Sequence, residues 1–279
     1  MALPAFAFRD GTLMPRLGMG TWRMGERAAA RADEVAALRL GLDLGMMLID
    51  TAEMYGEGGA EEVVAEAIRG RRDEVFLVSK FYPYHASRPQ LVRACEGSLK
   101  RLRIEALDLY LLHWRGSVPF AEMVETLGHL IEQGKVRRWG VSNLDRDELD
   151  AIAAVEGGER VATDQVLYAL AHRGPEFDLL GRCEALGIPL MAYSPLDQGG
   201  LAGHPEVGAV ARRLAVSAAQ VALAWVLRHP SVVAIPKAAR LEHVRANRAA
   251  ADLALDAAAL EALDKAFPPP RRKKPLEMV

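Results

Sequence analysis

The stretch Leu48-Ile49-Asp50-Thr51-Ala52-Glu53-Met54-Tyr55-Gly56 carries most of the information about the fold. The apolar run 46–49 delivers a carboxylate, Asp50, and then a phenol, Tyr55, into a loop that contains glycine. Two later apolar runs end in the same way, because residues 75–79 lead to Lys80 and residues 107–112 lead to His113. A parallel barrel brings the carboxyl ends of its strands to one face, where its active site lies, so we expect these four ionisable side chains to meet.

Short apolar runs alternate with helical patterns along the rest of the chain, which favours a parallel sheet. Strands are expected at 16–20, 46–50, 75–79, 107–112, 136–141, 162–166, 188–193 and 232–236. Helices are expected near 33–44, 60–69, 88–103, 119–133, 145–154, 175–186, 206–229, 240–250 and 256–266. Eight such strand–helix units predict an α/β fold of the (β/α)8 TIM-barrel type.

The two ends of the chain carry weaker signals. Residues 6–9 and 12–15 flank Asp10-Gly11, a pair that is favoured in two-residue hairpin turns. We therefore expect an N-terminal β-hairpin over residues 1–15 that caps the barrel. No linker or low-complexity break divides the chain, so residues 1–279 are expected to form a single domain with a short tail over 267–279. The basic run 271–274 in this tail is expected to be only solvated.

Composition limits the classes of function. The chain has 279 residues, 51% of them apolar, a formal net charge of −2 and a pI near 6.4, so no overall field favours nucleic acid or membranes. Only two cysteines occur, which is typical of a reducing compartment. The N-terminus lacks the features of a secretory signal, and no apolar run reaches the roughly 18 residues of a membrane span. We expect a cytoplasmic protein with no nucleic-acid, membrane or obligatory protein partner.

The four strand-end residues suit protonation of an oxygen atom that receives a hydride. A tyrosine with a pKa of about 10 is a poor acid near neutrality, and a nearby cation such as Lys80 lowers that pKa. One charge at about 4 Å and an effective dielectric of about 20 is worth roughly 4 kcal/mol, or up to about three pKa units before the opposing desolvation. Asp50 can keep Lys80 ionised and oriented, and His113 can donate a hydrogen bond to a carbonyl oxygen.

A hydride requires a carrier, and a nicotinamide is implied. The usual dinucleotide fingerprint is missing, because Gly18-Met19-Gly20-Thr21-Trp22-Arg23 has arginine in place of the third glycine. Other strand ends offer suitable groups: hydroxyl and amide side chains at 140–143 and 164–165, and an aromatic ring at Tyr193. A cationic helix start follows Ile235-Pro236-Lys237, the region where barrels commonly hold phosphate.

At these positions the chain resembles the aldo-keto reductase family, and most of all its bacterial branch that reduces methylglyoxal and 2,5-diketogluconate. The matching segments are Gly20-Thr21-Trp22, Ser142-Asn143, Gln165, Tyr193-Ser194-Pro195-Leu196 and Ile235-Pro236-Lys237, together with Asp50, Tyr55, Lys80 and His113. The resemblance implies NADPH-dependent reduction of small aldehydes or ketones, methylglyoxal-like or keto-sugar compounds, to alcohols, with NADH as a weaker alternative. It implies Tyr55 as the general acid and Asp50, Lys80 and His113 as the other catalytic residues.

The resemblance also implies which residues hold the cofactor. Ser142, Asn143 and Gln165 would hold the carboxamide, and Tyr193 would stack on the nicotinamide ring. Lys237, Arg240 and His243 would hold the 2′-phosphate, and Asn247 the adenine. Gly20, Thr21, Trp22, Asp50, Ser194, Pro195 and Leu196 would complete the cofactor site. Two departures weaken NADPH selectivity: Ala238 stands where Ser or Thr is usual, and His243 where Arg is common. Asp164 stands where Asn is frequent.

The substrate pocket is expected to have an aromatic wall. The resemblance implies that it is formed by Trp22, Tyr55, Tyr82, His113 and Trp114. Because the tail after the last helix is short, a loop that encloses a bulky ligand is not expected, which favours a small polar carbonyl compound.

Three other classes of function compete with this interpretation. A serine hydrolase is disfavoured because Leu144 replaces the last glycine of a nucleophile elbow at 140–144. A metal-dependent hydrolase is disfavoured because the seven histidines lack metal-ligand spacing, and no metal is expected. A cofactor-sensing binding module is the third, since some family relatives serve as subunits of membrane channels. Turnover of a carbonyl compound would separate an enzyme from such a module.

Overall fold

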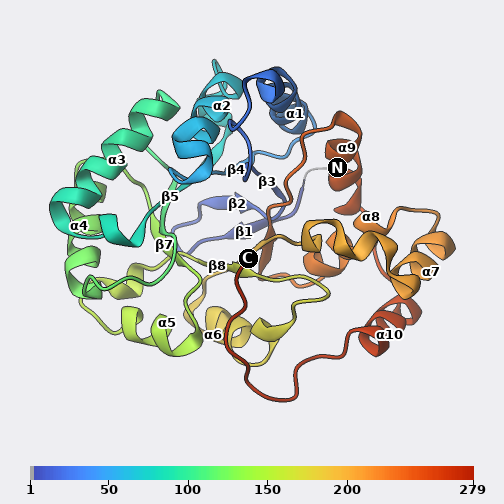
Figure 1. Ribbon diagram of the computed structural model, residues 1–279. Helices are drawn as coiled ribbons and strands as arrows, with labels where there is room; N and C mark the ends of the chain where they lie inside the picture. Colours follow the sequence, from blue (N-terminus) through green and yellow to red (C-terminus); the bar gives the residue numbers. More distant parts are fainter. Residues whose placement is uncertain (1–2) are drawn as a thin grey trace.

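Eight parallel strands form the centre of the molecule in the computed structural model, which describes residues 3–279. The strands are β3 (Gly18–Gly20), β4 (Leu48–Asp50), β5 (Phe76–Phe81), β6 (Leu109–Leu112), β7 (Trp139–Ser142), β8 (Asp164–Leu167), β9 (Leu190–Tyr193) and β10 (Val232–Ala234). Each pairs with the next in chain order. Helices surround them on the outside (Figure 1), so the predicted (β/α)8 barrel is confirmed.

The barrel closes between its first and last strands. Bridges join Leu17 to Ala234 and Gly20 to Lys237, and the Ala234 amide donates to the Arg16 carbonyl at 2.8 Å. A Cβ atom at Gly20 would lie 2.7 Å from the Ile235 carbonyl oxygen. Glycine is therefore required here because the two backbones approach each other closely.

Ten α-helices lie between the strands along the chain or after the last strand. They are α1 (Arg31–Asp43), α2 (Gly59–Ala67), α3 (Arg88–Leu102), α4 (Phe120–Glu132), α5 (Arg146–Ala153), α6 (Leu179–Leu186), α7 (Pro205–Leu214), α8 (Ala218–Leu227), α9 (Leu241–Ala250) and α10 (Ala257–Ala266), within residues 3–279. Apolar side chains between this ring and the strands form the larger core.

The single helix expected over 206–229 is wrong, because the structure has α7 and α8 there, bent by 91°. Ala215 adopts the left-handed conformation with φ of 55°, which ends α7. Ser217 then caps α8, since its hydroxyl accepts a hydrogen bond from the Gln220 amide at 3.2 Å.

The expected hairpin is present in β1 (Ala5–Ala7) and β2 (Leu13–Pro15), and its first two expected residues, 1–2, lie outside the described part of the chain. Its turn differs from the prediction. The Phe8 amide donates to the Thr12 carbonyl at 2.9 Å and Gly11 has φ of 82°, so the loop has three residues, 9–11, with glycine in the left-handed position. Phe8 and Met14 pack into the apolar cluster inside the barrel.

No single helix among residues 3–279 has the length and apolarity to cross a membrane; α7 and α8 pass that test only when taken together as a bent pair.

Candidate active site

The four predicted side chains meet at the carboxyl ends of the strands. Lys80 is fully buried, and its Nζ donates to Asp50 Oδ2 at 2.7 Å, to the Thr51 carbonyl at 3.0 Å and to the Tyr55 hydroxyl at 3.2 Å. The Tyr55 and His113 rings meet edge to face with centroids 5.7 Å apart. The strand ends thus bring together residues that lie up to 63 positions apart in the sequence.

Sheet register explains this meeting. Asp50 is the last residue of β4 and pairs with Gly20 and Val78 on the neighbouring strands. Lys80 lies two residues beyond Val78 on β5, so both side chains point into the same end of the barrel. Tyr55 begins a short 3₁₀ turn, Tyr55–Gly58, in which Gly56 has φ of 57°.

The charges of the site follow from burial and from these contacts. Burial opposes the charge on Lys80, but Asp50 and Tyr55 outweigh it and raise the pKa of Lys80 above its ordinary value, so the ammonium is ionised. Burial raises the pKa of Asp50, although Lys80 and Gln165 oppose that rise.

The pKa of Tyr55 is shifted upward, whereas the sequence led us to expect that Lys80 lowers it. Burial raises the pKa of Tyr55 by more than Lys80 lowers it. The hydroxyl is therefore a protonated phenol near neutrality, which is the form that can donate a proton.

His113 is neutral near neutrality. Burial, with a smaller contribution from Lys80, holds the pKa of His113 well below its ordinary value. Its Nδ1 has no hydrogen-bond partner among the side chains and backbone of residues 3–279. A neutral imidazole carries one N–H donor, so His113 can offer a hydrogen bond to a ligand without carrying charge.

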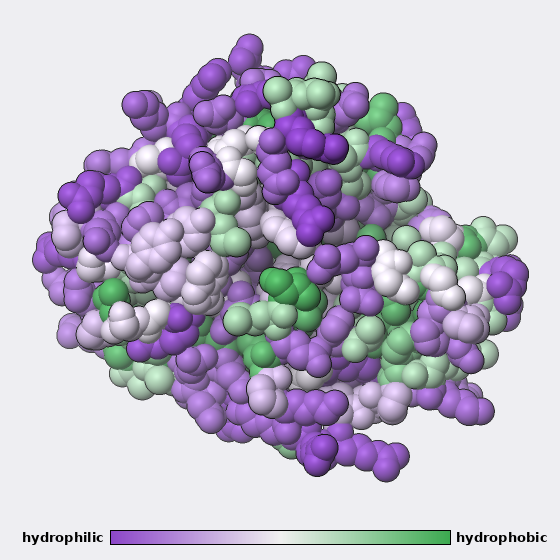
Figure 2. Space-filling view, in the orientation of Figure 1, coloured by the Kyte–Doolittle hydropathy of each residue, from purple (hydrophilic) through white to green (hydrophobic). Residues whose placement is uncertain are grey.

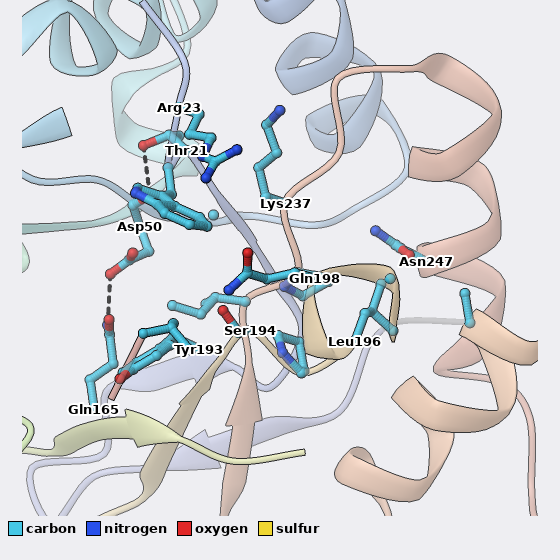
Figure 3. A pocket seen from close by; sticks show the side chains of 18 of the residues that line it. Thr21, Arg23, Asp50, Gln165, Tyr193, Ser194, Leu196, Gln198, Lys237 and Asn247 are labelled. Atoms are coloured by element: carbon cyan, nitrogen blue, oxygen red, sulfur yellow. Dashed lines mark hydrogen bonds between the residues drawn. The ribbon is translucent and has the colours of Figure 1, made fainter. Parts of the chain in front are cut away.

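Above these residues lies a cavity of about 1040 Å³. It forms a hollow in the middle of the barrel face, beside a group of hydrophobic residues (Figure 2). Figure 3 shows that it is elongated, with Asp50, Gln165 and Tyr193 at one end and Lys237 and Asn247 toward the other. The predicted residues that line it are Gly20, Thr21, Trp22, Asp50, Tyr55, His113, Trp114, Ser142, Asn143, Gln165, Tyr193, Ser194, Pro195, Leu196, Lys237, His243 and Asn247.

A hydrogen-bond network supports the end of the cavity near the tetrad. Gln165 Nε2 donates to Asp50 Oδ1 at 2.7 Å, across the barrel from β8 to β4 (Figure 3). The Tyr193 hydroxyl donates to Asn143 Oδ1 at 2.9 Å, and the Asn143 amide donates to the His113 carbonyl at 3.0 Å. One amide group predicted to hold the cofactor, that of Gln165, therefore also orients Asp50.

Three predicted residues, Lys80, Tyr82 and Arg240, do not line the cavity. Lys80 is buried and contacts the Tyr55 hydroxyl, which does line it. Arg240 precedes α9 with its side chain 74% exposed and 3.7 Å from Glu242. The Tyr82 ring stacks on Tyr84 with centroids 4.6 Å apart. Neither side chain lines the cavity, and the roles expected for Tyr82 in the substrate pocket and for Arg240 in cofactor binding stay predictions.

The cavity also has lining residues that the sequence did not single out. They include Arg23, Met54, Gln198, Glu242, Met278 and Val279. Arg23 could have been found, because it directly follows Trp22; its guanidinium lies 4.4 Å from the centre of the Trp22 ring. Met278 and Val279 carry no motif, and only the path of the chain brings them here.

One residue of the basic run in the tail forms ion pairs with the barrel. Lys273 of the basic run lies 3.3 Å from Asp145 and 3.4 Å from Asp178. The expectation that the run 271–274 is only solvated is therefore wrong for Lys273, because carboxylates at the starts of α5 and α6, Asp147 at 3.7 Å among them, surround it there.

A barrel with this buried Asp–Tyr–Lys–His cluster at its mouth defines a class of oxidoreductase, and comparisons with known proteins agree. The family model for the Aldo/keto reductase family matches residues 16–267. The Escherichia coli protein "Methylglyoxal reductase YeaE" is 52% identical over 277 residues, which cover 98% of each chain.

Solved structures agree with the sequence comparison. A Klebsiella pneumoniae aldo/keto reductase in complex with NADP and acetate superimposes with a TM-score of 0.97 at 52% identity, covering 100% of both chains. The thermostable aldo-keto reductase Tm1743, in complex with the inhibitor epalrestat, gives a TM-score of 0.86 at 38% identity, covering 92% of this chain and 97% of that one. The chain belongs to the aldo/keto reductase family.

Proposed function

We propose that this aldo-keto reductase uses NADPH to reduce small aldehydes and ketones, of the methylglyoxal or keto-sugar kind, to alcohols. The observation that carries the proposal is the contact at 3.2 Å between Lys80 Nζ and the Tyr55 hydroxyl beside the cavity. The Escherichia coli relative is named a methylglyoxal reductase, and the Klebsiella relative was crystallised with NADP.

The residues present fit a dinucleotide. The cavity volume of about 1040 Å³ suits a large ligand, and its length runs from the tetrad toward α9 (Figure 3). Asn247 is buried and lines the α9 end of the cavity. Arg23, Asn143 and Ser194 all have positive φ, and such backbone strain is concentrated at ligand clamps. When bound, the nicotinamide supplies the hydride; Ser142, Asn143, Gln165 and Tyr193 would hold its end of the cofactor.

The chain's own residues would manage the proton. A carbonyl oxygen within reach of Tyr55 and His113 would accept a hydrogen bond from each side chain. As the oxygen gains negative charge, the Tyr55 O–H bond breaks and its proton passes to that oxygen, so the product is an alcohol. Lys80 stabilises the phenolate that remains, because its ammonium lies beside that oxygen. His113 stays neutral and orients the carbonyl.

The cavity wall favours small substrates. Trp22, Trp114 and Met54 line the cavity together with Tyr55 and give its wall apolar surface. The cytoplasmic location and the absence of a protein partner remain predictions.

A panel of carbonyl compounds with NADPH and with NADH tests the proposal, read by the absorbance of the reduced nicotinamide. We expect oxidation of NADPH that depends on a small aldehyde or ketone such as methylglyoxal, and slower oxidation of NADH. Tight NADPH binding without turnover of any carbonyl in the panel would contradict the proposal and favour a cofactor-sensing module.

A further inference from the structure

The last residues of the chain fold back across the mouth of the barrel. After α10, the segment 271–279, which we call the strap, runs to the centre of the barrel face (Figure 1). Met278 and Val279 line the same cavity as Tyr55 and Tyr193. The strap therefore borders the space above Tyr55 and Tyr193 that a substrate would enter.

Ionic contacts tie the strap to the barrel at two points. At the first, Lys273 bridges Asp145 and Asp178, which precede α5 and α6. At the second, the His172 ring lies between two carboxylates: its Nδ1 contacts Glu277 of the strap, and its Nε2 lies 3.0 Å from Asp197. The His172 side chain is 25% exposed, so this second tie is partly shielded from water.

Asp197 connects this second tie to a segment of the chain that lines the cavity. It begins the 3₁₀ segment η7 (Asp197–Gly203), and Gln198 and Gly199 of that segment line the cavity. Asp197 and Gln198, which are not glycines, both have positive φ, so the backbone is strained at these two residues and depends on its contacts. His172 thus contacts one residue of η7, Asp197, and one residue of the strap, Glu277.

We propose that His172 is a positioning residue that clasps the strap to η7, so that the strap forms the ceiling of the substrate pocket and restricts it to small carbonyl compounds. This inference rests on the proposed function. A small substrate gains from the closed ceiling because water is excluded around it, whereas a bulky one must displace the strap.

Protonation of His172 strengthens the clasp. Only the imidazolium can donate from both ring nitrogens at once. Burial lowers the pKa of His172, but hydrogen bonds and charge from Glu277 and Asp197 outweigh it and raise that pKa. These two carboxylates face the ring from the strap and from η7, while the neighbouring Arg173 is turned to Glu176 and Asp264. The clasp is fully present below the ordinary pKa of about 6.5 and is lost as pH rises through the raised pKa.

Hydrogen exchange of the strap, followed by mass spectrometry at about pH 6, tests the clasp without reference to turnover. We expect peptides covering 271–279 to exchange faster in His172→Ala and in Glu277→Gln than in the wild-type protein. His172→Arg, which keeps a charged donor, should exchange nearly as slowly as wild type. His129→Ala on α4 and Glu261→Gln on α10 are matched controls without contact to the clasp. Unchanged exchange in both His172→Ala and Glu277→Gln would overturn the proposal.

Methylglyoxal and phenylglyoxal form a matched pair of substrates that differ only in methyl and phenyl. In His172→Ala and Glu277→Gln we expect the ratio of kcat/KM for phenylglyoxal to that for methylglyoxal to rise roughly tenfold, a size of effect typical of a change in pocket fit. His172→Arg should restore the wild-type ratio. Faster exchange of the strap with an unchanged ratio would overturn its role as the ceiling. Failure of the wild-type protein to reduce either compound would contradict the proposed function, and the exchange measurement would still decide the clasp.

Discussion

Lys80 is an ammonium group without exposed surface, held by Asp50, the Thr51 carbonyl and Tyr55. An unpaired buried charge is costly, and removing one partner of such a pair typically costs about 3–5 kcal/mol. The tetrad is therefore a single electrostatic unit, and changes to its members should not act independently.

Lys80→Met and Asp50→Asn should each impair carbonyl reduction, because both disturb the proton donor Tyr55. We expect the double variant to lose little more activity than the worse single variant, since the residues act as a unit. Single-turnover rates with bound NADPH measure this. A loss in log rate that equals the sum of the two single losses would argue against coupling.

The pH dependence of reduction should be flat around neutrality. Burial raises the pKa of Tyr55 above its ordinary value of about 10, and it holds the pKa of His113 well below about 6.5. Tyr55 therefore stays protonated and His113 stays neutral between these limits. We expect kcat at saturating NADPH to fall only at high pH, as Tyr55 loses its proton. A midpoint near pH 8 with the chemical step rate-limiting would contradict this assignment.

Side chains at strand ends were predictable because a strand fixes both the position and the direction of its last residue. Asp50, Lys80 and His113 follow that rule, and Tyr55 follows the Gly-containing loop. The contact from Gln165 to Asp50 was not predictable, because it joins residues 115 positions apart across the barrel. The net direction of the Tyr55 pKa also depended on burial, which the sequence does not quantify.

At the scale of elements, the start of α9 should set cofactor choice. Lys237 lines the cavity, whereas Arg240 lies outside its wall and near Glu242. A charge-assisted hydrogen bond is worth roughly 1.5–3 kcal/mol, or about a ten- to hundredfold preference. Lys237→Ala should therefore raise KM for NADPH strongly and leave KM for NADH nearly unchanged, while Arg240→Ala should do less. Equal KM values for both cofactors in the wild-type protein at low ionic strength would sink this prediction.

Barrel closure depends on the contact between β3 and the segment after β10. In Gly20→Ala the new methyl group would lie 2.7 Å from the Ile235 carbonyl oxygen, so the two backbones must separate. Overpacking of this kind typically costs about 1–3 kcal/mol of unfolding free energy. Urea unfolding of the variant and the wild-type protein measures this difference in unfolding free energy. Gly128→Ala in α4, where a Cβ meets nothing within 4 Å, is the control and should be neutral or stabilising. If Gly20→Ala and Gly128→Ala had the same free energy of unfolding, the close contact between β3 and Ile235 would not be needed for barrel closure.

Strands and most helices were predictable because short apolar runs alternate with periodic ones. The break between α7 and α8 was missed because no glycine or proline marks it, and Ala215 takes the left-handed conformation. A local signal was available in Ser217-Ala218-Ala219-Gln220, which has the pattern of a capping box. The three-residue hairpin loop was missed because Asp10-Gly11 is compatible with more than one turn.

For the whole molecule, we propose that the chain is one cooperative unit, as predicted for a single domain over residues 1–279. The hairpin buries Phe8 and Met14 in the barrel, and the strap contacts α5 and α6 through Lys273. Far-UV circular dichroism and fluorescence of the buried Trp139 and Trp225 should therefore give one coincident urea transition. Two separated transitions would contradict a single domain.

The path of the strap is the property of the whole molecule that the sequence concealed. Its ties join Lys273 to Asp145 and Glu277 to His172, pairs separated by more than a hundred residues. No periodicity links such residues, so only the folded chain brings them together.

The central claim is that Tyr55 donates the proton in carbonyl reduction. Tyr55→Phe keeps the ring and removes only the hydroxyl that contacts Lys80. The most direct measurement is the single-turnover rate of methylglyoxal reduction by the NADPH-bound variant, with the Kd for NADPH measured in parallel. We expect the rate to fall about 10²- to 10⁴-fold while the Kd stays near the wild-type value. A near-wild-type rate in Tyr55→Phe would contradict the account.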